Sequence, residues 1–136
     1  MRLELTHRGD YAVRAMLALH EARDQQLSAS EIGARMRIPA SYVGQVMADL
    51  SRAGLARAVL GRHGGYRLGR RPEAITLLDV VRACEPDIGR TSCVLRGSPC
   101  AEGGHCQVHA AFATAEAALL AVLGRTPLSV AARSAG

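Results

Sequence analysis

The segment that begins at Ser28 constrains the fold of this 136-residue chain more than any other stretch. Ser28-Ala29-Ser30-Glu31 forms a capping box, in which the serine caps a helix and the glutamate reaches back. A turn over residues 37–40 separates this helix from a second helical pattern over residues 41–53, and Gly54 stands at a C′ position. Two short helices across a tight turn are typical of a helix-turn-helix, whose second helix enters a DNA major groove.

A basic hairpin follows the two helices. Residues 55–60 and 66–68 predict two strands, joined by a glycine-rich turn over residues 61–65. A helix-turn-helix followed by such a hairpin is the order of a winged helix. Eight of the 17 arginines and one of the 12 acids lie in residues 35–71. A localised basic block indicates a face that binds a polyanion, and arginine kept for solubility is the alternative.

Seven residues of this block, together with Arg2 near the start of the chain, are candidates for contact with DNA. Three polar residues at the start of the second helix are expected to face base edges, and the basic residues to hold phosphates or a minor groove. A glycine in the tip of the wing completes the set. The candidates are Arg2, Ser41, Tyr42, Gln45, Arg52, Arg62, His63 and Gly64.

Further helical patterns surround this block. Residues 10–22 form an alanine-rich pattern, with Asp10 placed to cap the helix or to favour the positive end of its dipole. Thr76 is expected to cap a helix over residues 77–85, and a long helix is expected over residues 108–123 with one further turn after it. The predicted fold is therefore mainly α with a small β-wing: a winged helix-turn-helix domain followed by a long C-terminal helix.

The long C-terminal helix carries a continuous apolar stripe, because five of its apolar side chains recur at spacings of three and four. The members are Val108, Phe112, Ala115, Leu119 and Leu123. A stripe beyond a domain that already has a core predicts a partner helix in a second subunit. The alternative is that the helix folds back on its own domain. We expect a homodimer, because winged-helix proteins usually bind paired half-sites.

Four segments are expected along the chain. Residues 1–85 form the DNA-binding domain, and residues 86–107 form a cysteine-rich loop. Residues 108–130 hold the dimerisation helix and a short C-terminal segment, and residues 131–136 form a flexible tail.

The compartment follows from the absence of targeting signals. No apolar run is long enough for a membrane span, and the charged start of the chain lacks the pattern of a signal peptide. We therefore expect a cytoplasmic protein, in which thiols stay reduced, and this favours metal binding over disulfides. Cys84 lies in a helical pattern and is expected to be a small buried residue.

The other three cysteines and two histidines are grouped late in the chain, where glycines and a proline predict a loop. The spacing is Cys93-x6-Cys100-x5-Cys106-x2-His109. It lacks the tight cysteine pairs of structural zinc, and its wider intervals suit an iron–sulfur cluster. Zinc and a metal-free thiol switch are the alternatives. Three thiolates leave one ligand missing, for which His109 is the local candidate and Asp10 the remote one.

Four motifs spread over nearly the whole chain match one known pattern. They are Met1-Arg2-Leu3 with Gly9-x-Tyr11-Ala12-Val13-Arg14-Ala15-Met16-Leu17; Ile38-Pro39-Ala40-Ser41-Tyr42-Val43; Gly61-x-x-Gly64-Gly65-Tyr66-x-Leu68; and Cys100-x-x-Gly103-Gly104-x-Cys106-x-x-His109. Together they resemble the family of winged-helix regulators that includes IscR and NsrR. The combination is specific, although each motif alone is not.

The resemblance implies a homodimeric cytoplasmic transcription factor, usually a repressor, with a cluster held by Cys93, Cys100 and Cys106. In IscR-like members a histidine matching His109 completes a two-iron cluster. In NsrR-like members an aspartate matching Asp10 completes a four-iron cluster that reacts with nitric oxide. The chain has both residues. We favour His109 because of its local spacing.

These observations predict a DNA-binding regulator whose operator binding is controlled by an iron–sulfur cluster that senses redox state, nitric oxide or cluster and iron status. A cluster-free winged-helix regulator that senses through cysteine thiols or zinc is the first alternative. A small redox enzyme is the second. It is disfavoured because the chain has no Cys-x-x-Cys and because an enzyme would leave the basic block unexplained.

Overall fold

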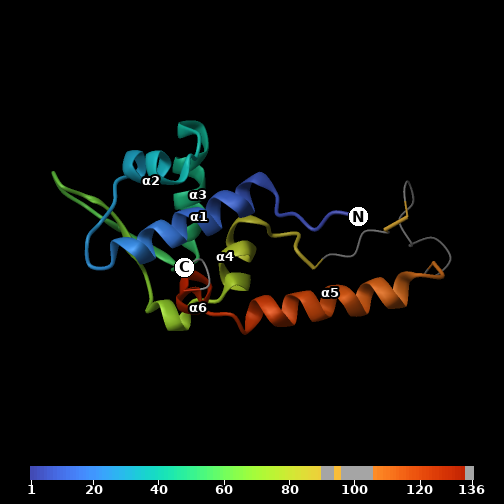
Figure 1. The fold of residues 1–136 in the computed structure, drawn as a ribbon. Coiled ribbons are helices and arrows are strands. Elements are labelled where there is room, and N and C mark those ends of the chain that lie inside the picture. Colours follow the sequence, from blue (N-terminus) through green and yellow to red (C-terminus); the bar gives the residue numbers. More distant parts are fainter. Residues whose placement is uncertain (90–93, 96–105, 134–136) are drawn as a thin grey trace.

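The structure of the protein is a computed structural model that describes residues 1–89, 94–95 and 106–133. It is mainly helical, with a two-stranded sheet that forms the wing (Figure 1). In chain order the elements are α1 (His7–Ala22), α2 (Ala29–Met36), α3 (Ala40–Arg52), β1 (Ala56–Val59), β2 (Gly65–Leu68), the 3-10 helix η1 (Pro72–Ala74), α4 (Leu77–Cys84), α5 (His109–Gly124) and α6 (Leu128–Arg133). The predicted fold class is confirmed.

Helix α1 lies at the centre and contacts α2, α3, α4 and α6. It begins at His7, earlier than the sequence pattern predicted, because the Thr6 hydroxyl accepts a hydrogen bond from the Gly9 N–H at 3.2 Å and caps the helix. Asp10 is therefore not the cap. It lies in the first turn, where a carboxylate stabilises the positive end of the helix dipole.

The helix-turn-helix forms as its local signals predicted. The Ser28 hydroxyl accepts the Glu31 N–H at 3.1 Å and caps α2. The Glu31 carboxylate reaches back to the Ser28 hydroxyl at 3.2 Å, whereas a full capping box would bond it to the Ser28 N–H. Arg37 ends α2 in the left-handed region with φ 54°, and this turns the chain toward α3. After α3, Gly54 adopts φ 75°, a backbone conformation that costs glycine little free energy. The chain then continues into the first strand of the wing.

The wing is an antiparallel pair in which Ala56 lies opposite Leu68 and Val59 opposite Gly65. Leu27, in the connection between α1 and α2, extends this pair by one bridge. Its N–H donates to the Tyr66 carbonyl at 3.0 Å and its carbonyl accepts the Tyr66 N–H at 2.7 Å. The base of the wing is thereby fixed to the helices.

The core is aliphatic and lies where α1, α3, α4 and α6 meet. Its largest fully buried side chains among the described residues are Met16, Leu19, Leu27, Ile32, Met47, Leu50, Leu55, Ile75 and Leu128. Leu128 belongs to α6, and its N–H donates to the Ile75 carbonyl at 2.7 Å. The end of the chain therefore returns to the winged-helix body. Helix α6 extends to Arg133, into the segment expected to be a flexible tail, and residues 134–136 lie outside the described part.

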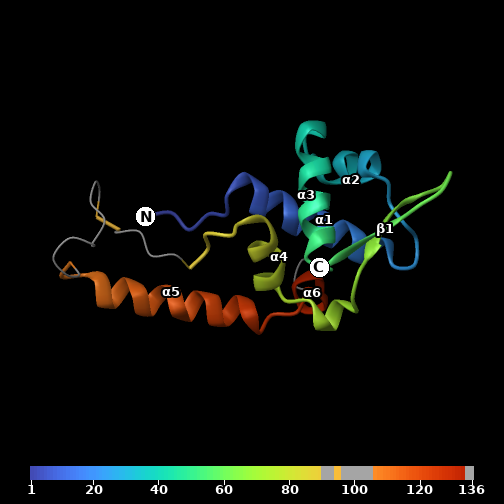
Figure 2. The same ribbon diagram turned by 180° about the vertical axis from the view of Figure 1, so that it is seen from behind.

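Helix α5 runs beside α4 and extends away from the remaining helices, as both views show (Figures 1 and 2). Gly124 at its C-terminal end lies close to Leu78 of α4. No residue of α5 is buried within the chain, and Phe112 of the predicted stripe is 40% exposed. In the described part of the chain, none of the helices has both the length and the apolar character that a bilayer crossing requires.

Candidate nucleic-acid interface and cysteine loop

Helix α3 separates a buried face from an exposed polar face. Val43, Val46, Met47 and Leu50 point into the core. Ser41, Tyr42 and Gln45 are exposed, and so are Gly44 and Ala48. The three predicted base-contacting residues therefore share an open face of α3, as their spacing indicated. Gly44 and Ala48 add no bulk to that face, and for this reason sequence reasoning did not select them.

The Tyr42 ring is positioned by α1. It makes an edge-to-face contact with the Tyr11 ring at a centroid distance of 5.2 Å, and Tyr11 stacks on the His7 ring at 6.1 Å. Such contacts add about 0.5–1.5 kcal/mol beyond the burial of area. They fix the start of α3 against the first turns of α1. This row of rings could not be predicted from the sequence, because its members come from two separate helices.

Asp49 joins α1 to the end of α3. Its carboxylate pairs with the Arg8 guanidinium of α1 and, at 3.0 Å, with the Arg52 guanidinium. The Asp49 side chain is only 13% exposed, whereas the Arg52 side chain is 74% exposed. Arg52 is a predicted phosphate contact. Asp49 holds its side chain in place, and most of that side chain is still exposed to solvent. Arg2, the candidate farthest from α3 in sequence, pairs with Glu4 at 3.7 Å, and both side chains are largely exposed.

The tip of the wing presents Arg62 and His63 to solvent. The Gln26 amide donates a hydrogen bond to the His63 carbonyl and ties the tip to the α1–α2 connection. Gly64 has a structural role: a Cβ there would lie 2.3 Å from the Val59 carbonyl oxygen. Gly61 supports the same turn with φ 121°.

We expect Gly64→Ala to destabilise the protein by about 1–3 kcal/mol, because backbone atoms must move to admit the methyl group. Gly44→Ala is the matched control. A Cβ at Gly44 meets nothing within 4 Å, so this change should stabilise α3 by about 0.5–1 kcal/mol. Urea unfolding of the two variants measures both free energies, and an equal effect of the two changes would contradict the assigned role of Gly64.

Two of the four predicted local metal ligands lie in the described part of the chain, and they are neighbours. Cys106 is half-buried, and its carbonyl accepts the His109 N–H at 3.1 Å in the turn that opens α5. His109 is the first residue of α5 and is also half-buried. Cys93 and Cys100 fall outside the described residues. Among the described residues alone, three potential ligands do not come together.

Asp10, the remote candidate ligand, is held by an arginine on its own helix. The Arg14 Nε lies 2.9 Å from the Asp10 carboxylate, and the Arg14 guanidinium also donates to the Met36 carbonyl at 3.2 Å. The Asp10 side chain is 37% exposed. Arg14 pairs with one carboxylate oxygen, Oδ1, and an ionised carboxylate has further acceptor sites for a metal ion.

The start of the cysteine loop is fastened to the start of α1. Glu85 follows α4, and its carboxylate accepts the Thr6 N–H at 2.6 Å and also the Thr6 hydroxyl. Gly9 makes room for this contact, because a Cβ there would lie 2.2 Å from the Glu85 carboxylate. Thr6 and Glu85 are 79 positions apart, and no sequence pattern reveals the pair.

Cys84 is buried, and the prediction of a small core residue is confirmed. Burial raises the pKa of its thiol to about 11, and the neighbouring Asp49 carboxylate adds to the shift. The thiol therefore stays protonated at neutral pH, which makes it a poor nucleophile and a poor metal ligand.

A family model described as "Iron-dependent Transcriptional regulator", Rrf2, matches residues 5–133. The "HTH-type transcriptional regulator IscR" of Aliivibrio salmonicida is 38% identical over 110 residues, which are 79% of this chain and 64% of that protein. The regulator of the same name from Vibrio cholerae is 38% identical over 109 residues, covering 79% and 62%. The alignments thus cover less than two thirds of these relatives.

Solved structures match the whole fold. The structure of CymR, "the Global Cysteine Regulator of B. subtilis", has a TM-score of 0.79 at 25% identity and covers 98% of both chains. The structure of T. potens IscR has a TM-score of 0.78 at 26% identity and covers 98% of this chain and 89% of the other. Because the family model matches nearly the entire sequence, the protein belongs to the Rrf2 family of transcriptional regulators, and not to a family of enzymes.

Proposed function

We propose that the protein is a cytoplasmic, homodimeric transcriptional repressor whose binding to operator DNA is controlled by an iron–sulfur cluster. The observation that carries the DNA-binding part is the exposed face of α3 beside a basic wing. Ser41, Tyr42 and Gln45 would read base edges in a major groove. Arg62 and His63 would contact phosphates or the adjacent minor groove.

The dimer is proposed to form through α5. Of its 16 residues, Glu116 is the one acid, no residue is lysine or arginine, and none is buried within the chain. Its C-terminal part lies against α4, and an apolar helix that its own chain covers only in part favours association with a second copy. Phe112, at 40% exposure, and Val122, at 46%, are its most exposed large side chains.

The proposed cluster ligands are Cys93, Cys100, Cys106 and His109, with Asp10 as the alternative fourth ligand. Cys106 and His109 fit such a group, because a thiol and an imidazole stand half-buried within one turn of each other. The bound cluster would supply a reversible response to oxygen, nitric oxide or iron supply. His109 is the first residue of α5, so the helix would hold it in position as a ligand.

The contacts at the two ends of the cysteine loop would transmit a change at the cluster ligands to the helices that bind DNA. At one end Glu85 holds Thr6, the cap of α1, and Arg8 on α1 holds Asp49 on α3. At the other end His109 opens the dimer helix. A loop that changes its conformation would shift α1 against α3 at one end and α5 at the other. The distance between the two recognition helices of the dimer would change as a result.

The test of DNA binding is its dependence on salt. The logarithm of affinity for a mixed-sequence duplex should fall linearly with the logarithm of salt concentration. Arg62→Gln should reduce the slope by about one per subunit, because one phosphate contact is lost. Arg125→Gln removes the same charge from the exposed end of α5 and should leave the slope unchanged. A slope near zero in the unmodified protein would refute DNA binding.

A cluster-free regulator that senses through its thiols is the second candidate. It is favoured by the likeness to Staphylococcus aureus CymR, whose oxidised form has a TM-score of 0.76 at 25% identity and covers 96% of both chains. In that case Cys93, Cys100 and Cys106 would act through oxidation, without metal. Iron and sulfide analysis of anaerobically purified protein separates the two candidates.

A further inference from the structure

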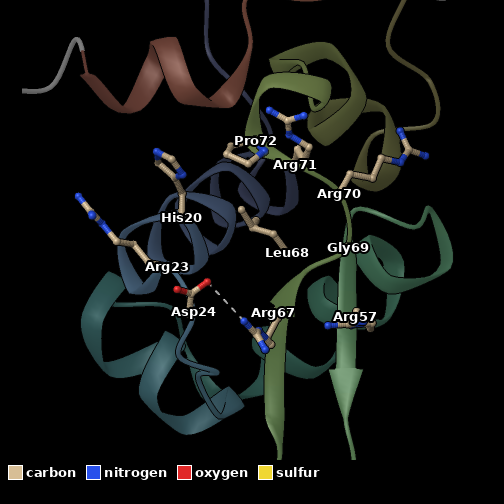
Figure 3. A pocket seen from close by; sticks show the side chains of 10 residues that line it. All are labelled: His20, Arg23, Asp24, Arg57, Arg67, Leu68, Gly69, Arg70, Arg71 and Pro72. Atoms are coloured by element: carbon tan, nitrogen blue, oxygen red, sulfur yellow. Dashed lines mark ion pairs between the residues drawn. The ribbon is translucent and has the colours of Figure 1, made fainter.

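A basic hollow of about 610 Å³ lies where the end of α1, the wing and η1 meet (Figure 3). Five arginines from these three parts of the chain line it, with Asp24 as the one carboxylate among the lining residues. The arginines are Arg23, Arg57, Arg67, Arg70 and Arg71. Its volume falls within the range of small-molecule sites, roughly 300–1,000 Å³.

The hollow is separate from the proposed DNA-reading residues. None of its ten lining residues belongs to α2 or α3, and none is among the eight candidates for DNA contact. The DNA contacts proposed for α3 and for the tip of the wing therefore do not account for the basic charge of this hollow.

Much of this charge is uncompensated. The Arg67 guanidinium lies 3.7 Å from an Asp24 carboxylate that is fully exposed, and Arg71 lies 3.6 Å from Glu73. Such exposed and long ion pairs neutralise little charge. In the described part of the chain, Arg23 and Arg57 form no ion pair with a carboxylate. Arg70 donates to the Ala53 carbonyl at 3.3 Å. Arg23, Arg57, Arg67 and Arg71 thus line the hollow with little opposing charge.

The backbone at the rim is strained at an arginine. Arg23 ends α1 with φ 55° and ψ −114°, a combination that side-chain-bearing residues rarely adopt. Its N–H donates to the His20 carbonyl at 3.2 Å, which holds the turn in place. Glycine would relieve the strain, but it would remove a positive charge from the hollow. Strained residues are concentrated at binding and catalytic sites.

The chemistry of the lining identifies a class of ligand. A guanidinium binds two phosphate oxygens at once, and arginines on several sides of a hollow need more than one anionic group between them. Leu68 and Pro72 supply an apolar part of the wall. We propose that the hollow binds a small anion with two or more linked phosphate groups, at a site distinct from the DNA interface and the cysteine loop.

Isothermal titration of the full chain with inorganic tripolyphosphate, at constant ionic strength, tests the site. One saturable site per chain is expected. Arg57→Gln and Arg23→Gln should each weaken binding about tenfold or more, because each removes a charge-assisted contact. Arg125→Gln is the matched control outside the hollow and should bind as the unmodified protein does. Circular dichroism of each variant reports whether the fold is retained.

Three outcomes would overturn the proposal. Tripolyphosphate binding could be absent, or equally weak in Arg57→Gln and Arg125→Gln. Orthophosphate could bind as tightly as tripolyphosphate, which would exclude a requirement for linked phosphates. Finally, Arg57→Gln could weaken only binding to a duplex long enough to reach the base of the wing, which would make the hollow a contact for DNA phosphates. The titration involves neither operator nor cluster, so its failure would leave the proposed function untouched.

Discussion

Cys106→Ser is expected to abolish the visible absorbance of anaerobically purified protein and the response of its DNA binding to oxygen, nitric oxide and iron. A serine hydroxyl does not ionise at neutral pH and is a hard ligand, so one of three proposed sulfur ligands is lost. Cys106 stands one turn before His109, and the change leaves the winged-helix core intact. Absorbance, iron and acid-labile sulfide should fall together.

Cys84→Ala is the matched control for this experiment. Its thiol is buried and has a pKa of about 11, so it is not suited to hold a metal at neutral pH. The variant should keep the spectrum of the unmodified protein. If instead the spectrum survives Cys106→Ser, or if operator binding still responds when Cys93, Cys100 and Cys106 are all serine, the cysteine loop is not the sensor.

The same spectroscopy identifies the fourth ligand. His109→Ala should shift or bleach the absorbance, whereas Asp10→Ala should leave it unchanged, because His109 lies one turn from Cys106, a proposed ligand. The reverse result would assign Asp10 as the ligand and place the cluster between α1 and the loop.

Phe112→Glu is expected to convert the proposed dimer into monomers at micromolar concentration. Burial of a large apolar side chain contributes about 1.5–3 kcal/mol, and a two-fold interface loses this contribution twice. A loss of about 3 kcal/mol or more corresponds to at least roughly a hundredfold rise in the dimer dissociation constant. Sedimentation equilibrium measures this constant.

Leu60→Glu is a suitable control for the dimer experiment. Leu60 is 94% exposed, and it lies in the loop that joins the two strands of the wing, not on α5. This variant should remain dimeric. The monomeric Phe112→Glu protein should also lose most of its operator affinity, because two half-sites can no longer be bound together. A Phe112→Glu protein that stays dimeric, with unchanged circular dichroism, would show that α5 is not the interface.

Much of the candidate interface could be predicted from the sequence because its signals are local. The exposed face of α3 follows from helical spacing, and the turn of the wing follows from its glycines. The contacts that each of these side chains makes could not be predicted. Arg52 shares Asp49 with Arg8, and the Tyr42 ring lies against Tyr11. These partners come from different elements, so only the packing of α1 against α3 brings them together.

The sequence by itself determined the order of the elements and most of their ends. Caps such as Ser28 and Thr76 act through hydrogen bonds within one turn, and these depend on neighbouring residues alone. Tertiary structure alone decided that Glu85 holds Thr6, that α5 is covered only in part, and that five arginines line one hollow. Each of these facts depends on contacts between residues far apart in the chain, and such contacts exist only after the core has placed the elements side by side.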